Sequence, residues 1–505
     1  MPATNVTAGT STETSTKTFT AVEETKQRLA SLEDFIGTQM ERTGVPGLAM
    51  AIVKDDEVIF SRGFGFRDVQ KGLPVTPHTL FMIASVTKSF TAMSMGLLVD
   101  EGKLDWDTPV RRYLPEFRMH DPVATERLTP RDLGCHRSGL PRHDFSWAGA
   151  TMSRQVLLER IPHLEPTRDL RTTWQYQNLM YATAGQMVGR VAGTTWEDFV
   201  HKRILTPLGM NRTSFDPETT RYDPLYANSY EKKDGGVREL GYVNLNAEAT
   251  GPAGVMISSV TELVEWIRLH LNQGKLNGEE FVSGKTLGEM HKPHILTHAH
   301  QTVYPELPMQ AYGLGWFVEP YRGHQIVHHG GNLPGFHSLI TMMPDEHMGM
   351  VFLTNLSGNF LPTVLSYYIY DLVLGLNPVD WTTRFEQEHT KLETDTREHN
   401  RAIDEARTSD TTTSQPLESF TGEYYHAGYG PLSVVLEDNT LVIRYNQQSI
   451  PLTHYHYDQF EVKNDWFERK LVGTFWTNTK GVVDRLSLPL EPTKGANEIM
   501  FVRKG

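Results

Sequence analysis

The chain has 505 residues, of which 39% are hydrophobic and 22% charged, and its formal net charge at pH 7 is −13. This composition is typical of a globular protein that is long enough for more than one domain. The acidic balance argues against a nucleic-acid partner or an anionic membrane surface. No apolar run approaches the roughly 20 residues that a membrane-spanning helix needs.

The single cysteine, Cys135, excludes an intramolecular disulfide. Residues 1–17 are rich in Thr and Ser and contain no apolar segment of the kind that a secretory leader has. We therefore expect a reducing, cytoplasmic location. Residues 1–20 are expected to form a disordered tail.

Residues 21–383 form the first predicted domain. An apolar stripe over residues 29–40 predicts a helix, and two apolar runs, residues 47–53 and 58–66, predict a β-hairpin. Helical signals follow up to residue 271. Strand signals then return at residues 312–318, 325–328, 336–343 and 349–355, before a last helix at 361–374. Since strands lie at both ends, we expect an α+β fold, an antiparallel sheet with a helical insert.

The remaining residues change in character twice. Residues 384–415 are polar and predict a solvated helix and a linker. Residues 416–505 contain short alternating runs cut by turn residues, which predict a small β-barrel. These runs are residues 433–436, 441–445, 460–462, 473–477 and 484–488. No residue in the sequence indicates which of three roles this domain has: capping a cleft, restricting substrate size or building an oligomer.

Ser85 and Lys88 form the most informative pair of the chain. Their spacing on a helix places hydroxyl and amine on one face, and an amine kept neutral by burial can take the serine proton. Apolar residues from 86 to 98 recur at helical spacing, so Ser85 lies in the first turn, where the helix dipole favours negative charge. An N-cap serine beside a solvated lysine is the alternative. A second such pair, Ser229 and Lys232, lies in a polar loop.

Tyr176 and Asn178 are candidates for the proton shuttle and a polar contact. A phenol beside a cationic lysine has its phenolate favoured, so Tyr176 could act as base and acid. Asn178 could hydrogen-bond the lysine or a substrate amide. Tyr226 and Tyr242 begin the same Tyr-x-Asn pattern, but Tyr176 precedes a predicted helix. A packed tyrosine at a helix start is the alternative.

A glycine-rich segment supplies candidates for oxyanion stabilisation. His329 is followed by Gly330, Gly331 and Asn332, and glycines let a backbone approach a ligand closely. A backbone N–H near Asn332, together with that of Ser85, would make a two-donor oxyanion hole. A hairpin turn with ordinary histidines is the alternative.

Together these motifs resemble those of the serine β-lactamase-related family, which includes class C β-lactamases, DD-peptidases, D-aminopeptidases and β-lactamase-fold esterases. The motifs, in order, are Ser85-x-x-Lys88, Tyr176-x-Asn178 and His329-Gly330-Gly331. Segments 128–133 and 251–254 also look like family segments, and the resemblance covers residues 29–374. Residues 416–505 resemble the lipocalin-like domain appended to some peptidase-type members.

The resemblance implies a serine hydrolase acting on an ester or amide bond of a small molecule or peptide. It makes Ser85 the acyl-enzyme nucleophile, Lys88 its activator and Tyr176 the general base and acid. His329 stands where penicillin-recognising members have a lysine. Because histidine is mostly neutral at pH 7, a permanent anchor for a substrate carboxylate is missing. The departure favours esters, amides or peptides over β-lactams.

Two rival functions remain open from the sequence. An acyltransferase on the same scaffold would pass the acyl group to an alcohol or amine, and a binding or scaffold protein would keep the fold without catalysis. No cofactor or metal site is predicted, since no cysteine or carboxylate frames the histidine-rich loop at 291–300. Assembly into a homo-oligomer is left open.

Overall fold

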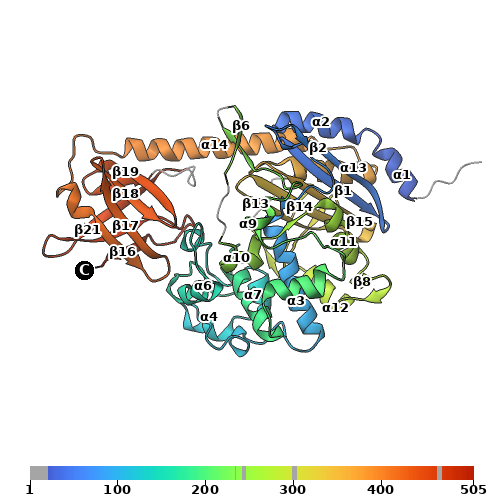
Figure 1. The fold of residues 1–505 in the computed structure, drawn as a ribbon, viewed down its shortest axis with the longest axis horizontal. Helices are drawn as coiled ribbons and strands as arrows, with labels where there is room; N and C mark the ends of the chain where they lie inside the picture. The colour runs from blue at the N-terminus through green and yellow to red at the C-terminus, as the bar shows by residue number, and fades with distance from the viewer. Residues whose placement is uncertain (1–20, 234, 242–245, 298–303, 463–468, 505) are drawn as a thin grey trace, which may run out of the picture.

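The computed structural model describes residues 21–233, 235–241, 246–297, 304–462 and 469–504. A large part made of sheet and helices and a small C-terminal barrel lie side by side, and one long helix connects them (Figure 1). The tail predicted at residues 1–20 lies outside the described residues. Within the described ranges, no helix is long and apolar enough to cross a membrane.

The large part is built on one antiparallel sheet, which has nine strands when counted over the described residues. Strands from the two ends of the domain meet at its centre, where β1 pairs with β15. In order across the sheet the strands are β10 (Ile295–Leu296), β11 (Ala311–Tyr312), β12 (Phe317–Tyr321), β13 (His324–Leu333), β14 (Phe336–Met343), β15 (Met348–Thr354), β1 (Gly47–Lys54), β2 (Glu57–Asp68) and β3 (Leu73–Pro74). The predicted α+β fold, with a helical insert in the sheet, is confirmed.

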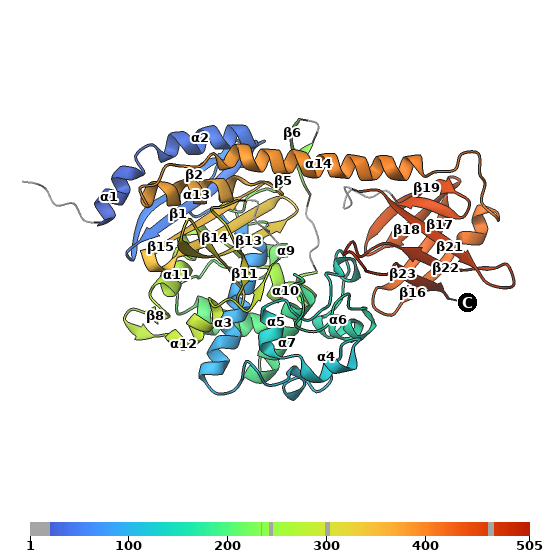
Figure 2. The ribbon, with the colours of Figure 1, turned by 180° about the vertical axis from the view of Figure 1, so that it is seen from behind.

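Helices cover both faces of this sheet, as Figure 2 shows from behind. Successive strand residues point to opposite faces, so in β1 Leu48, Met50 and Ile52 pack with the terminal helices, and the residues between them pack with the insert. Each fully buried Leu or Ile contributes about 1.5–3 kcal/mol. The terminal helices are α1 (Ala21–Arg28), α2 (Leu32–Thr43) and α13 (Leu361–Val373).

The insert between β3 and β10 holds most of the remaining helices. They are α3 (Thr87–Asp100), α4 (Pro122–Arg127), α5 (Pro130–Gly134), α6 (Arg154–Arg160), α7 (Leu179–Ala192), α8 (Trp196–Val200), α9 (Pro217–Thr220), α10 (Ala247–Gly254), α11 (Val260–Leu271) and α12 (Gly284–Met290). Short strand pairs join them: β4 (Phe81–Met82) with β7 (Ile257–Ser258), β5 (Tyr230–Lys233) with β6 (Gly236–Glu239), and β8 (Lys275–Leu276) with β9 (Glu279–Glu280).

Two strand predictions in this part need correction. The strand predicted at residues 312–318 is divided into β11 and β12, because Gly315 at φ +79° turns the chain between them. Residues 329–333 continue β13 rather than form the alternative hairpin turn. The turn comes later, at Gly335 (φ +82°).

The C-terminal part follows α14 (Trp381–Glu405), which begins one turn before the predicted position. The predicted barrel is confirmed: over the described residues it has eight strands, and β16 pairs with β23 to close it. The strands are β16 (Gly422–His426), β17 (Gly430–Glu437), β18 (Thr440–Tyr445), β19 (Gln448–His456), β20 (Gln459–Val462), β21 (Leu471–Thr477), β22 (Val483–Leu488) and β23 (Ile499–Arg503). Of these, β16, β19 and β23 lie outside the predicted runs. The domain boundaries at 383/384 and 415/416 stay predictions.

The buried carboxylate of Asp132 stabilises the insert by hydrogen bonds to several of its segments. Asp132 in α5 is 0% exposed and accepts hydrogen bonds from the Arg137 Nε (2.6 Å), the Arg171 Nη2 (2.8 Å) and the Thr129 backbone N–H (2.9 Å). Burial alone would raise the pKa of Asp132, but the two guanidinium groups hold it below its ordinary value. This cluster links the loop after α5 to the segment that leads to Tyr176.

We expect Asp132→Asn to lower the free energy of unfolding by about 3 kcal/mol, because it leaves partly buried guanidinium groups without their counterion. The measurement is urea denaturation at pH 7. Asp107→Asn is the matched control, since this carboxylate pairs with Arg131 but is 68% exposed, and about 1 kcal/mol or less is expected. Equal midpoints for the two variants would contradict the role of Asp132.

Candidate active site

Ser85 lies on a strained turn, η1 (Ala84–Val86), which joins β4 to α3. Ala84 has φ +48°, a conformation that costs a non-glycine residue on the order of 1 kcal/mol. The turn is held by the Ser338 hydroxyl on β14, which donates to the Ile83 carbonyl at 2.7 Å. Ser85 itself is partly exposed whereas its neighbours in the chain are buried. The turn therefore presents the hydroxyl at the boundary between sheet and insert.

Lys88 is 0% exposed and its amine has three oxygen neighbours. The Nζ lies 3.0 Å from the Ser85 Oγ, 2.8 Å from the Asn178 Oδ1 and 2.7 Å from the Ala253 carbonyl oxygen. Three segments of the insert, α3, the start of α7 and α10, thus converge on one nitrogen. The alternative of a solvated lysine beside a capping serine does not describe this pair.

The protonation state of Lys88 follows from these neighbours. Burial, and then the positive charge of Arg142, lower the pKa of the amine well below its ordinary value. A neutral amine has two hydrogens and one lone pair. The carbonyl oxygens of Ala253 and Asn178 can only accept, so they take the hydrogens and leave the lone pair for the Ser85 hydroxyl. An amine in this arrangement can take the serine proton.

Tyr176 lies just before α7, beside the Ser85 side chain. The Lys88 Nζ lies 4.7 Å from the centre of its ring. Burial raises the pKa of Tyr176, although the Ser85 side chain and the charge of Arg142 oppose this. The phenolate expected from the sequence is therefore not favoured. The expectation assumed a cationic lysine, whereas burial lowers the pKa of Lys88 and favours its neutral form.

His329 lies on β13 and is 1% exposed. Its Nδ1 is 2.6 Å from the Gly330 carbonyl, which can only accept, so the Nε2 accepts from the Tyr312 hydroxyl at 2.9 Å. Burial, with the nearby Lys88, lowers the pKa of His329 to about 3. The imidazole is neutral, and both of its nitrogens are engaged.

The next residues of β13 approach the serine turn closely. A Cβ at Gly331 would lie 2.3 Å from the Ile83 carbonyl oxygen and 2.8 Å from the Ala84 Cβ, so only glycine fits without displacement. Asn332 is exposed, and its Oδ1 accepts from the Gly358 backbone N–H at 3.0 Å. A contribution of Asn332 to an oxyanion would come from its backbone.

Sequence reasoning missed two charged residues of the site, Arg142 and Asp144. The Arg142 Nε donates to the Asp144 Oδ2 at 2.6 Å, and its guanidinium carbon lies 5.4 Å from the centre of the Tyr176 ring. The Asp144 Oδ1 accepts from the Asn178 Nδ2 at 3.2 Å. Nothing in the local sequence distinguishes Arg142 or Asp144 from surface charges.

Aromatic rings line one side of the site. His136 lies 4.3 Å from the Tyr176 ring and 4.7 Å from the Tyr312 ring, and Trp174 lies 5.9 Å from Phe317, all measured between ring centres. Tyr312 is buried in the core beside the catalytic candidates, and the partly buried Phe317 packs against that core. The wall excludes water from one side of Tyr176 and His329.

Among the described residues, no group of three or more metal-ligating side chains is arranged to hold an ion. Within the histidine-rich loop, the His291 Nε2 lies 3.0 Å from the His270 Nδ1. His298 and His300 lie outside the described residues.

Two family models match parts of the chain. Residues 32–373 match the family model described as Beta-lactamase. Residues 406–503 match a model described only as a domain of unknown function, DUF3471.

Curated relatives cover most of the chain. Unguisins hydrolase ungD' of Aspergillus campestris is 26% identical over 92% of this chain and 90% of its own length. Unguisins hydrolase ungD of Aspergillus violaceofuscus is 30% identical over 78% of this chain and 74% of its own length.

Among solved structures, the octameric penicillin-binding protein homologue from Pyrococcus abyssi has the same fold. It aligns with a TM-score of 0.61 at 23% identity, covering 94% of this chain and 99% of that one. Because the Beta-lactamase model matches about two thirds of the residues, the chain belongs to the beta-lactamase family.

Proposed function

We propose that the protein is a serine hydrolase that forms an acyl-enzyme at Ser85 and cleaves an ester or amide bond of a small molecule or peptide. The observation that carries the proposal is the contact between the Lys88 Nζ and the Ser85 Oγ, with the other two neighbours of the amine being pure acceptors. A neutral base aimed at a partly exposed hydroxyl is the requirement for a serine nucleophile.

In the acylation step, Lys88 takes the Ser85 proton while the Oγ attacks the substrate carbonyl. The backbone N–H groups of Ser85 and of β13 near Asn332 stabilise the oxyanion. Tyr176, as a neutral phenol, gives its proton to the leaving oxygen or nitrogen and regains one from Lys88. The leaving group departs and the acyl group stays on Ser85.

In the deacylation step, water attacks the ester carbon of the acyl-enzyme. The water proton passes to Lys88 or Tyr176, and the carbon–Oγ bond breaks with return of a proton to Ser85. His329 is assigned a positioning role in both steps, because its nitrogens are engaged by Gly330 and Tyr312 and its pKa is lowered to about 3.

The state of His329 also bears on the substrate. A neutral, buried imidazole cannot serve as a fixed cationic anchor for a carboxylate, which favours esters, amides and peptides over penicillins. Two relatives bear the name unguisins hydrolase, which supports hydrolysis as the reaction class. The octameric state of the Pyrococcus homologue supports a homo-oligomer for this chain as well, which stays a prediction.

Ser85→Ala should abolish the covalent adduct with a fluorophosphonate and the turnover of p-nitrophenyl acetate, because the nucleophile is removed. Intact-mass spectrometry and absorbance measure the two. The matched control is Ser229→Ala, the serine of the other Ser-x-x-Lys pair, which should react like the wild type. An adduct that persists in folded Ser85→Ala protein would overturn the proposal.

Lys88→Ala and Tyr176→Phe should each lower kcat on the order of a hundredfold, the usual contribution of a positioned proton-transfer group. Lys232→Ala and Tyr226→Phe are the controls, since they alter the competing sequence patterns outside the site. Steady-state kinetics with p-nitrophenyl acetate provides the measurement. Undiminished activity in either test variant would refute its assigned role.

Arg142→Gln should move the acid limb of the kcat/KM profile to higher pH. The neutral amine of Lys88 is the active form, and the positive charge of Arg142 lowers its pKa while Asp144 raises it. Removing the cation and freeing Asp144 both raise that pKa, so a higher pH is needed to deprotonate Lys88. Arg112→Gln, an equal charge change at an exposed site, should leave the limb in place. A shift to lower pH in Arg142→Gln would contradict this coupling.

A further inference from the structure

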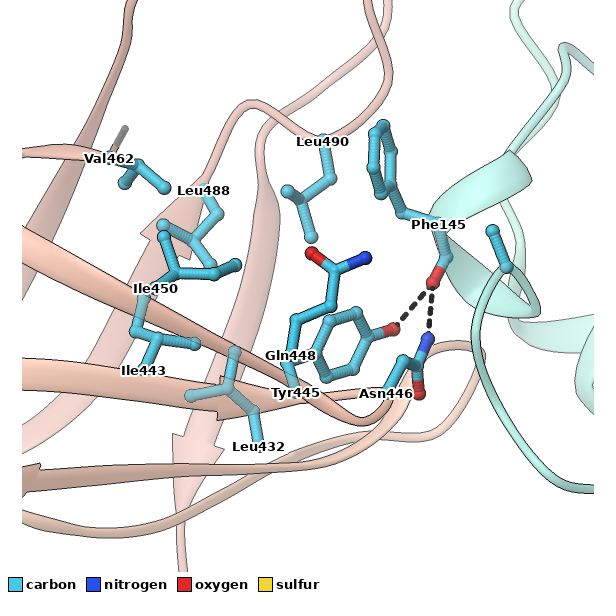
Figure 3. Close-up of a pocket in the computed structure, with 11 residues that line it drawn as sticks. Phe145, Leu432, Ile443, Tyr445, Asn446, Gln448, Ile450, Val462, Leu488 and Leu490 are labelled. Carbon is cyan, nitrogen blue, oxygen red and sulfur yellow. Dashed lines mark hydrogen bonds between the residues drawn. The ribbon is translucent and has the colours of Figure 1, made fainter. Parts of the chain in front are cut away.

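The segment of residues 142–147, called here the site loop, lies between the active site and the C-terminal barrel. On one side it carries Arg142 and Asp144, which contact Tyr176 and Asn178. On the other side it meets the barrel, as Figure 3 shows for Phe145 and its neighbours. A contact to the barrel can therefore reach the active site through one short segment.

Barrel side chains hold the residues on both sides of Asp144. The Phe145 carbonyl accepts from the Tyr445 hydroxyl at 2.7 Å and from the Asn446 Nδ2 at 3.0 Å (Figure 3). The His143 backbone N–H donates to the Glu491 Oε2 at 2.6 Å. The backbone immediately before and after Asp144 is thus fixed by the other domain.

The side chain of His143 is also held from the barrel. Its Nε2 donates to the Glu165 carbonyl at 3.1 Å, so its Nδ1 accepts from the Tyr429 hydroxyl at 2.8 Å. His143 has φ +45°, which a non-glycine residue adopts only when its surroundings enforce it. Contacts with the barrel hold His143 in this conformation.

Apolar side chains also contribute to the contact between the site loop and the barrel. Phe145 packs against the buried apolar cluster and lines one pocket together with barrel side chains (Figure 3), namely Leu432, Ile443, Ile450, Leu488 and Leu490. Buried apolar residues of the insert and of the barrel belong to one continuous cluster. The barrel is therefore packed on the insert and not merely tethered to it.

Asp144 in turn fixes the orientation of the Asn178 amide. Its Oδ1 can only accept, so the Nδ2 of Asn178 points to it and the Oδ1 of Asn178 faces Lys88. With the amide reversed, an N–H would face the amine and compete with Ser85 for its lone pair. The orientation that makes Lys88 a base for Ser85 depends on Asp144.

We propose that the C-terminal barrel is part of the catalytic apparatus: Tyr445, Asn446 and Glu491 are positioning residues that act through Asp144 and Asn178 on Lys88. The inference rests on the proposed function of Ser85 and Lys88. It assigns the barrel a role in the rate of acylation, since displacements of about 1 Å near a reacting group can cost on the order of a hundredfold in rate.

The test is a double-mutant cycle in the full-length protein. The clamp variant combines Tyr445→Phe with Asn446→Gly, where glycine keeps the φ of +46° accessible. It is compared with Asp144→Ala and with the combination of all three changes. We measure the fluorophosphonate labelling rate, and kcat and KM with p-nitrophenyl acetate.

The clamp variant and Asp144→Ala should each lower the labelling rate and kcat about tenfold or more, with KM within about twofold of the wild type. The combined variant should lose no more than Asp144→Ala alone, because the barrel acts through that carboxylate. The matched control is Gln447→Gly in the same turn, which removes the 2.8 Å bond to the Thr151 hydroxyl and should leave the rate unchanged.

Two results would overturn the inference: a wild-type labelling rate in the clamp variant, or losses that add up in the combined variant. If the clamp variant does not fold, Tyr445→Phe alone replaces it, and the same labelling rate, kcat and KM are measured. Retention of the adduct by Ser85→Ala would instead overturn the proposed function, and the inference with it. A serine-dependent adduct with an unchanged clamp-variant rate overturns only the inference.

Discussion

The buried amine of Lys88 is the group on which the rest of the site depends. An ammonium ion at this place would lose its hydration, so burial favours the neutral form. The neutral form is useful only if its lone pair faces Ser85, and this is decided by where the two hydrogens go. The carbonyls of Ala253 and Asn178 accept them. Burial thus favours the neutral amine, and the two carbonyl acceptors determine where its lone pair points.

The convergence of segments on Lys88 requires close backbone approaches. β13 can lie against the serine turn only because Gly331 has no Cβ, and the turn itself holds Ala84 in a left-handed conformation. Strain of this kind, on the order of 1 kcal/mol, persists where surrounding contacts enforce it. Here the Ser338 hydroxyl binds the Ile83 carbonyl from the neighbouring strand. The sheet thus supports the turn, and the insert supports the amine.

Sequence reasoning identified those parts of the site that are encoded locally. Ser85 and Lys88 lie three residues apart, and helical spacing predicts that their side chains share one face. The protonation of Tyr176 cannot be inferred in this way, because burial of its own phenol raises its pKa, and spacing does not reveal that burial. Asp144 gave no signal, since its role arises from a contact with Asn178, 34 residues away. The alternating runs predicted a barrel, but the contact between Phe145 and Tyr445 joins residues 300 positions apart.

Such long-range contacts change the meaning of the domain division. Two domains that meet through a small polar interface are expected to move relative to one another. In this chain the apolar cluster is continuous from the insert into the barrel, and Phe145 packs against it and lines a pocket with barrel side chains. The conformation of the site loop is therefore determined as much by the barrel as by the insert that encodes it. A loop held from outside its own domain allows Asp144 to keep one orientation while Ser85 remains open to substrate.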